Sequence, residues 1–458
     1  MLHHKLKIEE IAKATSGQIL NGDKNAEISD VIIDTRKPHN KETLFVPLKG
    51  DRVDGHSFIP AFFSGGGGAS IASSTIGGRC IILVRDTKKA LGDIAKLYRS
   101  KFDVPIVAIT GSVGKTSTKE MIALALSKHF GADKVVKTHA NFNNEIGLPL
   151  TLFNLSPNTQ VAVTEMGARA FGDINYLSNI AKQKIAVITN IGTAHIGEFG
   201  SRENILKAKM EIANNLPQGG ALIINGDDEM LKNAKLPKKL SVIKYGLGLA
   251  NDVLAKDVEM SDTNCEFIVD DVKFDIPLVG RHNVYNALAS VAVAKVLGIS
   301  VAEVADSLKG IGGDDAIRQK VINAGDYTII DDTYNAGVES MSAGLEVLMR
   351  MAKSGDKEHR AVAILGDMLE KGEFSAAEHA QVGSCCAQNL VDVLITIGKD
   401  SAYIAKQAEA DGVEDCHHFD TIEHAKGYIK DVVAAGDIVF VKASRGMHFE
   451  KVVELLQN

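Results

Sequence analysis

The sequence has no tryptophan and only five cysteines among its 458 residues. The cysteines are odd in number and lack CxxC spacing, so we interpret them as reduced thiols rather than a disulfide framework or a zinc site. No stretch approaches the roughly 18 continuous apolar residues that a membrane span needs. Residues 1–11 carry alternating charges and no apolar run, unlike a signal peptide. We therefore expect a cytoplasmic protein without a membrane span.

A large excess of charge of one sign is also absent. The chain has 51 Lys+Arg and 58 Asp+Glu, a formal net charge of −7, and no basic block. This balance argues against a general nucleic-acid binder. Hydrophobic residues make up 45% and charged residues 24%, which is typical of a globular protein. The length predicts about three domains.

Apolar runs and glycine-rich joints predict three domains, at residues 1–103, 104–312 and 313–458, of which the last two are α/β. The expected strands are Val31–Ile33, Leu44–Leu48, Cys80–Val84, Val104–Ile109, Val161–Thr164, Ala186–Thr189, Ala221–Ile224, Tyr327–Ile330, Ala361–Leu365, Val393–Ile397 and Asp437–Val441. Helix-like stretches alternate with the later strands, which predicts a parallel, doubly wound sheet in the third domain. Gly310–Asp315 is interpreted as a linker.

The strongest local motif is Thr110–Ser117, which reads TGSVGKTS between an expected strand and an expected helix. Two glycines, a helix N-terminus, a lysine and a threonine hydroxyl are the groups that bind phosphates and Mg²⁺. The full P-loop pattern has a further glycine where Ile109 stands, so this is a shortened GxxGK[ST] loop. Its position favours a nucleotide site over a chance match.

Three candidate site residues follow the phosphate loop. Glu165 closes one expected strand, His195 lies just past the next, and Lys209 falls on the helix after it. Ligands of open α/β sheets bind at the carboxyl ends of the strands, where Glu165 and His195 would lie. Each residue alone has an ordinary structural interpretation, and it is their joint placement that indicates a site.

Further motifs extend the pattern over nearly the whole chain. They are Asp34–Arg36, Gly111–Met121, Asn143–Gly147, Glu165–Ala168, Ala194-His195, Phe199–Ser201 with Ala208-Lys209, Gly280–Asn283 with Asn286, Asp331–Ala336, Leu365–Met368 with Glu370 and Gly372, and Ser444–Met447. Together they resemble the Mur ligases, the ATP-dependent amide-forming enzymes of peptidoglycan precursor synthesis. The resemblance is greatest to the branch that joins D-alanyl-D-alanine to UDP-N-acetylmuramoyl-tripeptide.

This resemblance implies a three-domain architecture. A small N-terminal α/β domain would bind the UDP-sugar, a central P-loop domain would bind ATP, and a C-terminal Rossmann-like domain would bind the dipeptide and complete the ATP site. It also implies an acyl-phosphate route that yields ADP and phosphate. The resemblance further implies two Mg²⁺ ions, which together with nearby cations would neutralise the negative charge of a triphosphate beside a carboxylate. The expected assembly is a monomer.

The resemblance assigns roles residue by residue. The catalytic residues would be Lys115, Glu165, His195 and Lys209, and the Mg²⁺ ligands would be Thr116, Glu165, His195 and a carbamylated Lys209. A carbamate offers the oxygen ligands that Mg²⁺ prefers. The ATP contacts would be Gly111, Ser112, Val113, Gly114, Lys115, Thr116, Ser117, Asn283, Asn286, Arg318 and Asp332. The substrate contacts would be Asp34, Thr35, Arg36, Lys49, Asn143, Asn144, Asp367, Met368 and Glu370. Lys207 is the rival of Lys209, but it points to a different side of the helix.

The sequence departs from the usual pattern of the family at several positions. Val113 stands where Asn is usual, Gly337-Val338 replaces Asn-Pro, and Lys371 stands where Leu is common. The stretch Ile196–Glu198 after the histidine is also altered. None of these changes removes a charged catalytic group, so the expected reaction class is unaffected.

Two alternative functions stay open. The sister ligase that adds the third peptide residue usually carries an Asp-Asn-Pro-Arg motif in its last domain, and no proline occurs here after Pro277. A P-loop protein that only senses nucleotide belongs to a different class. It would not need Glu165, His195 and Lys209 together.

Overall fold

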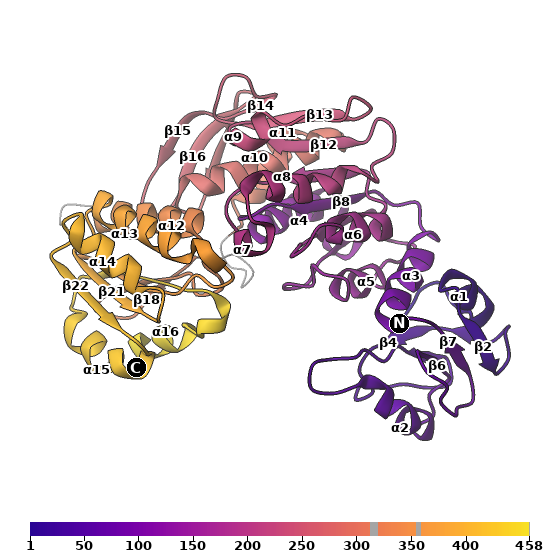
Figure 1. Ribbon diagram of the computed structural model, residues 1–458. Helices are drawn as coiled ribbons and strands as arrows, with labels where there is room; N and C mark the ends of the chain where they lie inside the picture. Colours follow the sequence, from indigo (N-terminus) through magenta and orange to yellow (C-terminus); the bar gives the residue numbers. More distant parts are fainter. Residues whose placement is uncertain (312–318, 354–358, 458) are drawn as a thin grey trace.

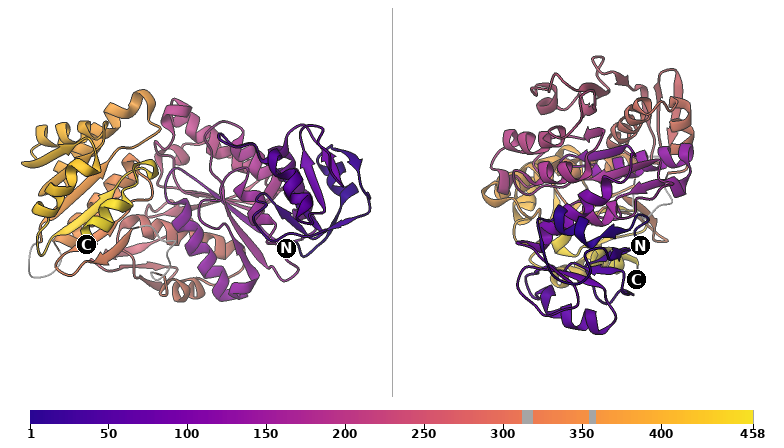
Figure 2. Two further views of the ribbon diagram at one scale, coloured as in Figure 1. Left: turned by 90° about the horizontal axis from the view of Figure 1, so that it is seen from below. Right: turned by 90° about the vertical axis from the view of Figure 1, so that its right-hand side faces the viewer.

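The structure is a computed structural model that describes residues 1–311, 319–353 and 359–457. Three α/β units follow one another, with the N-terminal and C-terminal units at opposite ends of the central one (Figures 1 and 2). The expected three-part α/β architecture is therefore confirmed. The part of the expected linker that follows Ile311, residues 312–315, lies outside the described residues. In the described part of the chain, no helix has both the length and the apolarity to cross a membrane.

The N-terminal unit is built on a five-stranded sheet in the order β2-β7-β6-β5-β4. A separate antiparallel pair, β1 and β3, lies beside it. The strands are β1 (Leu6–Lys7), β2 (Gln18–Asn21), β3 (Glu27–Ile28), β4 (Asp30–Ile32), β5 (Thr43–Phe45), β6 (Ala69–Ala72) and β7 (Ile81–Leu83), and the helices are α1 (Ile8–Ala14), α2 (Ile59–Ser64) and α3 (Thr87–Arg99). The three expected strands correspond to β4, β5 and β7, whereas the short or polar β1, β2 and β3 and the buried β6 were not anticipated.

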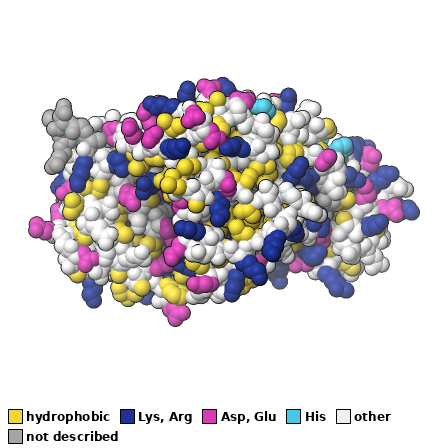
Figure 3. Space-filling model, turned by 90° about the horizontal axis from the view of Figure 1, so that it is seen from above, with side chains coloured by type: hydrophobic (Ala, Val, Ile, Leu, Met, Phe, Trp, Pro, Cys, Tyr) yellow, Lys and Arg dark blue, Asp and Glu magenta, His cyan; other side chains and the backbone are white. Residues whose placement is uncertain are grey.

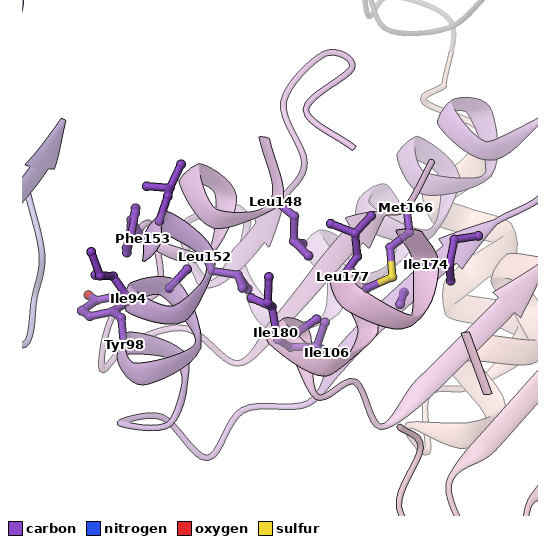
Figure 4. Close-up of a cluster of buried hydrophobic side chains, with 14 of the residues drawn as sticks. Ile94, Tyr98, Ile106, Leu148, Leu152, Phe153, Met166, Ile174, Leu177 and Ile180 are labelled. Atoms are coloured by element: carbon purple, nitrogen blue, oxygen red, sulfur yellow. The ribbon is translucent and has the colours of Figure 1, made fainter. Parts of the chain in front are cut away.

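Helix α3 joins this unit to the central one through a shared core (Figure 4). Its Ile94 and Tyr98 belong to the same buried cluster as Leu152, Phe153 and Ile180 of the central unit. The Tyr98 hydroxyl also donates to the carbonyl of Leu155 at 2.7 Å. A continuous apolar core makes relative motion of two units costly, so α3 fixes the N-terminal unit to the central sheet.

The central unit contains a seven-stranded parallel sheet in the order β14-β13-β12-β11-β8-β10-β9. Its strands are β8 (Ile106–Thr110), β9 (Val135–Lys137), β10 (Val161–Glu165), β11 (Ile185–Ile188), β12 (Ala221–Asn225), β13 (Ser241–Gly246) and β14 (Val253–Leu254). Its helices are α4 (Lys115–Phe130), α5 (Gly147–Leu152), α6 (Asp173–Ala181), α7 (Ile196–Phe199), α8 (Arg202–Met210), α9 (Glu229–Lys232), α10 (Arg281–Val296) and α11 (Val301–Leu308). Apolar clusters cover both faces, which explains the continuous apolar runs of β8 and β11.

A small antiparallel sheet follows the central one, with the order β15-β16-β17. Its strands are β15 (Lys256–Met260), β16 (Cys265–Val269) and β17 (Val272–Ile276). Phe267 and Phe274 stack between its strands, and both belong to the core that also covers the central sheet. This sheet was not anticipated from the sequence.

The C-terminal unit has a six-stranded sheet in the order β18-β19-β23-β20-β21-β22. Its strands are β18 (Lys320–Asn323), β19 (Thr328–Asp331), β20 (Ala361–Gly366), β21 (Val393–Ile397), β22 (Asp415–Phe419) and β23 (Ile438–Lys442), and its helices are α12 (Val338–Ala352), α13 (Ser375–Gln388), α14 (Ala402–Ala410), α15 (Ile422–Val432) and α16 (Glu450–Gln457). Helices α12 to α14 cover one face, and α15 and α16 the other (Figure 1). The sheet is parallel as expected, except for the antiparallel edge strand β18.

The surface seen from above carries basic and acidic side chains interspersed over most of its area (Figure 3). This distribution agrees with the small net charge of the chain. Several buried charged side chains, by contrast, lie where the central and C-terminal units meet, namely Glu165, Lys209, Asp332, Lys371 and Lys442.

Two helical glycines provide a test of the C-terminal packing. A Cβ at Gly344 of α12 would lie 2.1 Å from the ring of the buried Phe440, whereas one at Gly427 of α15 would meet nothing within 4 Å. We expect Gly344→Ala to lower the free energy of unfolding by about 1–3 kcal/mol through overpacking. Gly427→Ala should raise it by about 0.5–1 kcal/mol, because alanine is the better helix former. Denaturant unfolding of both variants checks this, and a gain for both would contradict the packing at Gly344.

Candidate active site

Strand β8 lies between β10 and β11, and all three are parallel. The register pairs Glu165 with Ile109 and Ile188 with Thr110, so the three strands end at the same level. A cavity of about 980 Å³ opens at this edge. The C-terminal unit closes its other side through residues of the β19–α12 connection and β23. The position is that of ligand sites in open α/β sheets.

The phosphate-loop sequence forms a tight turn between β8 and α4. Gly111 has φ of 146° and Gly114 has φ of 82°, conformations that favour glycine. A Cβ at Gly111 would lie 1.9 Å from the hydroxyl of Thr189. Helix α4 begins at Lys115, whose ammonium donates to the carbonyls of Gly111 at 2.8 Å and Ser112 at 3.1 Å. The N-terminus of α4 and a lysine thus face one cavity, as anion binding requires.

Glu165 is 1% exposed and meets the loop from the neighbouring strand. The Thr116 hydroxyl donates to its Oε2 at 2.9 Å, and the amide of Asn143 donates to its Oε1 at 2.7 Å. The carboxylate is therefore fixed beside a hydroxyl oxygen at the cavity wall. This donor set suits Mg²⁺, which commonly binds one or two carboxylates and completes its shell with water and substrate phosphates. Within the described residues, no group of three or more His, Cys, Asp or Glu side chains could hold a metal on its own.

His195 lies at the cavity wall with φ of 61°, a left-handed conformation that is uncommon outside glycine. Its Nδ1 is 2.7 Å from Oε2 of Glu370, although the direction of this contact is not that of a hydrogen bond. Burial lowers the pKa of His195, the Glu370 carboxylate opposes this, and the charges of Lys209 and Lys115 lower the pKa further. The imidazole nitrogens are therefore biased towards the neutral, ligand-competent form.

Lys209 is 1% exposed on α8 and lines the same cavity. Burial and the nearby charge of Lys115 lower the pKa of Lys209 to about 7, against the weaker opposite effect of Asp173 and Glu211. Within the described residues its Nζ forms no hydrogen bond or ion pair. Lys207 is exposed. The structure thus separates the two lysines as the helix periodicity predicts.

The C-terminal unit contributes a buried ion pair. Lys442 Nζ lies 2.6 Å from Oδ2 of Asp332, and it also donates to the carbonyl of Asn335 at 2.8 Å. Asp332 therefore lines the cavity with its carboxylate already paired to a lysine. On the opposite wall, Asn286 of α10 lines the cavity and accepts a hydrogen bond from Thr118 of α4 at 2.9 Å.

Most of the predicted nucleotide and metal residues meet at this cavity, together with the two predicted substrate residues Asn143 and Asn144. Those that line it are Ser112, Val113, Gly114, Lys115, Thr116, Ser117, Asn143, Asn144, Glu165, His195, Lys209, Asn286 and Asp332. Asn283 lies one helical turn before Asn286 but binds the carbonyl of Val279 instead of facing the cavity. Arg318 lies outside the described residues.

The predicted substrate residues at the two ends of the chain do not line this cavity. The Arg36 guanidinium donates hydrogen bonds to the carboxylate of Asp34 and lowers the pKa of Asp34 to about 2. Asp367 accepts three backbone N–H groups from Lys399, Asp400 and Ser401, which fixes the turn after β21. The remaining predicted substrate residues outside the cavity lining are Thr35, Lys49, Met368 and Glu370.

Several cavity residues were not singled out from the sequence. They include Tyr176, His282, Tyr285, Tyr334, Asn335, Glu339 and Lys442. His282, Tyr334 and Asn335 lie inside motifs that carry the family resemblance, so a signal existed for them. Lys442 ends an apolar strand, where a lone buried lysine would have indicated a paired carboxylate.

The fold and the site together define a family. Residues 109–294 match the Mur ligase middle domain, and residues 317–445 match the family described as Mur ligase, glutamate ligase domain. The chain belongs to the Mur ligase family.

Its similarity to particular members extends over the full length. It is 36% identical to the UDP-N-acetylmuramoyl-tripeptide–D-alanyl-D-alanine ligase of Bacillus subtilis, over 98% of both chains. It is 34% identical to the Escherichia coli enzyme of that name, over 96% of this chain and 97% of the relative. Among solved structures, MurF from Acinetobacter baumannii superposes with a TM-score of 0.91, at 30% identity over the whole of both chains. MurF from Thermotoga maritima in complex with ADP gives 0.81 at 28% identity, over 93% and 97%.

The buried Lys209 should make stability depend on pH. In the unfolded chain the amine has its ordinary pKa of 10.5, whereas the folded state lowers it to about 7. The unfolded state therefore binds more protons between these values, so the cost of burying Lys209 is full below pH 7 and fades as the pH rises. We expect Lys209→Met to stabilise the protein at pH 7 and to lose about half of this advantage by pH 9, with the rest fading as the pH approaches 10.5. Denaturant unfolding in CO₂-depleted buffer checks this.

The exposed Lys207 supplies the matched control for that measurement. Lys207→Met should leave the stability nearly unchanged at both pH values, because its amine is solvated in both states. An equal effect of the two substitutions would contradict the burial of Lys209.

Proposed function

We propose that this chain joins D-alanyl-D-alanine to UDP-N-acetylmuramoyl-tripeptide at the expense of ATP, with release of ADP and phosphate. Residues 1–103 would bind the UDP-sugar, 104–312 would bind ATP, and 313–458 would bind the dipeptide. The observation that carries the proposal is the single cavity that the phosphate loop, Glu165, Lys209 and the C-terminal Asp332–Lys442 pair line together. The names of the full-length relatives support the choice of substrates.

The geometry suits the first half of an acyl-phosphate reaction. The backbone N–H groups at the start of α4 and the Lys115 ammonium would bind the β- and γ-phosphates. Thr116 and Glu165 would hold one Mg²⁺, which when bound neutralises the triphosphate and polarises the γ-phosphoryl group. Transfer of that group to the tripeptide carboxylate would give an acyl phosphate. Asn143, which holds Glu165, would also border the path of this carboxylate.

In the second half, the amine of the dipeptide would attack the acyl carbon and phosphate would leave. The tetrahedral intermediate carries negative charge, which nearby cations stabilise when they are already in place. Lys115 is such a cation, and its charge acts on both Lys209 and His195. Closure of the C-terminal unit over the cavity would exclude water from the acyl phosphate.

Lys209 would serve as a carbamylated ligand of Mg²⁺, and His195 would help to hold a second ion. A carbamate forms only from the neutral amine, and a pKa of about 7 makes that form abundant at neutral pH. Its Nζ has no hydrogen-bond or ion-pair partner within the described residues, and Lys209 lines the cavity into which the added carboxyl group would extend. A free ammonium at this position would repel a metal ion, whereas a carbamate would bind it.

Product release with defined acceptors tests the proposed reaction. The purified chain is incubated with ATP, Mg²⁺ and UDP-N-acetylmuramoyl-tripeptide, and ADP and phosphate are measured with and without D-alanyl-D-alanine. We expect equal amounts of both products, formed only with the dipeptide. Diaminopimelate and lysine, offered with the UDP-linked dipeptide, serve as acceptors of the sister ligase. Turnover with these alone, or ADP release that needs no acceptor, would contradict the proposal.

Replacement of Lys209 tests its specific role. Lys209→Ala should abolish ligation and leave binding of the UDP-linked substrate intact, because the lost group is local to the metal site. A small carboxylic acid such as acetate should partly restore turnover by supplying an oxygen ligand in the vacated space. Steady-state rates with increasing acetate provide the measurement.

Lys207→Ala is the control in this experiment. It should keep most of its activity and should not respond to acetate, because Lys207 is exposed and absent from the cavity lining. Full activity of both alanine variants would exclude a carbamate in this protein.

A further inference from the structure

Thr193 lies in the loop between β11 and His195 and is held by two residues of the C-terminal unit. Its backbone N–H donates to Oε1 of Glu339 at 2.8 Å. Its carbonyl accepts a hydrogen bond from Nζ of Lys371 at 3.2 Å, and its hydroxyl lies 3.5 Å from the same ammonium. An acidic side chain from α12 and a basic side chain from the loop after β20 thus hold the backbone N–H and C=O groups of one residue of the central unit.

The opposite side of the same loop supports the phosphate loop. The N–H of Gly192 donates to the hydroxyl of Ser112 at 3.0 Å, and the N–H of Ser112 donates to the carbonyl of Asn190 at 3.1 Å. The side chain of Asn190 accepts from the N–H of Val113 at 2.9 Å and donates to its carbonyl at 3.0 Å. A displacement of Thr193 would therefore be passed to the phosphate loop through one or two hydrogen bonds.

Lys371 is itself held in place by Glu378 of α13, at 2.6 Å. The two side chains are 2% and 8% exposed. Burying such a pair costs desolvation of both charges, so it contributes little to stability unless its geometry is good. Its contact with Thr193 gives the pair a second role, which is to fix the ammonium at the boundary between two units.

Positions at which the sequence departs from the family pattern meet at this boundary. A Cβ at Gly197 would lie 2.8 Å from the carbonyl of Glu370 and 2.9 Å from the N–H of Gly372, so the backbone on either side of Lys371 leaves no room for a side chain. A Cβ at Gly337 would lie 3.9 Å from both Lys371 Nζ and Glu339 Oε2. Gly197, Gly337 and Lys371, which are far apart in the sequence, thus lie in the same contact region as Thr193.

We propose that Glu339 and Lys371 are positioning residues that couple docking of the C-terminal unit to the geometry of the phosphate loop. They act through Thr193 and not on the reacting atoms. The proposal rests on the proposed ligation for its activity readout, and on domain closure for a readout that needs no product. When the C-terminal unit docks, the hydrogen bonds that Glu339 and Lys371 form with Thr193 hold residues 190–193 against Ser112 and Val113. When it is displaced, that support is lost.

Two substitutions of Glu339 separate positioning from chemistry. Glu339→Gln keeps an oxygen that can accept from Thr193, whereas Glu339→Ala removes it. We expect the alanine variant to lower kcat by about tenfold or more, the factor by which loss of a hydrogen bond to a charged group shifts an equilibrium. The glutamine variant should recover most of this loss, and ATP binding in the absence of the other substrates should change little in either. An equal loss in both variants, or no loss in the alanine variant, would overturn the proposal.

Lys371 needs a companion change, because its loss alone would leave Glu378 buried and unpaired. The double variant Lys371→Met and Glu378→Gln removes both charges and keeps similar volumes. We expect it to unfold at nearly the parent temperature and to show a lower kcat. The exposed neighbour Glu373 supplies the control, Glu373→Gln, which should match the parent. A double variant with the parent kcat would exclude a role for Lys371.

Closure is measured on the full chain by small-angle scattering, with a non-hydrolysable ATP analogue, Mg²⁺ and UDP-N-acetylmuramoyl-tripeptide. We expect these ligands to reduce the radius of gyration of the parent and the Glu373→Gln control, and to reduce it less in Glu339→Ala. Closure of Glu339→Ala to the parent dimensions would overturn the coupling. If the parent closes but forms no product with D-alanyl-D-alanine, the proposed function fails, while the closure data still decide the coupling.

Discussion

The parallel alignment of β8 between β10 and β11 is the constraint on which the site depends. Each strand continues into a different functional segment: the phosphate loop after β8, Glu165 at the end of β10, and the loop to His195 after β11. Because the register places these ends at one level, the pairing of the strands alone brings together three segments that are tens of residues apart in the sequence. A slip of β10 by one residue would turn Glu165 away from Thr116, since neighbouring side chains on a strand point to opposite faces.

Electrostatics at that edge is arranged for a ligand. Lys115 and Lys209 lie close enough that each charge disfavours the other, and Lys209 is almost fully buried. In the protein alone this is a cost, met in part by deprotonation of Lys209. An incoming polyanion with its metal ions would convert the same arrangement into a favourable one. The Asp332–Lys442 pair on the C-terminal side is neutral overall, so the second wall shapes the cavity without adding to the positive charge.

The sequence predicted most of the strands that are buried on both faces and the residues at their ends, although the short buried strand β6 was missed. Val161–Thr164, Ala361–Leu365 and Val393–Ile397 correspond to β10, β20 and β21 within one residue, because continuous apolar runs have few other uses in an α/β chain. Strand β22 was missed since its sequence, Asp415–Phe419, is polar at an exposed edge. The sheet of β15 to β17 was missed because its alternating, half-exposed pattern differs from the runs around it. The N-terminal pair of β1 and β3 is too short to leave a signal.

The site residues also divide into those that the local sequence fixes and those that depend on tertiary contacts. Residues fixed by local sequence, such as Gly111, Gly114 and Lys115, could be placed from the motif alone, because the turn and the helix start follow from it. Residues that act through tertiary contacts could not. Lys371 was visible only as an unusual residue in a motif, and its partners Glu378 and Thr193 lie in α13 and in another unit. The burial of the Lys371 ammonium can be explained only with both units present, because the C-terminal unit supplies Glu378 and the central unit supplies the carbonyl of Thr193. Such interfaces therefore carry information about closure that a single motif, however specific, does not contain.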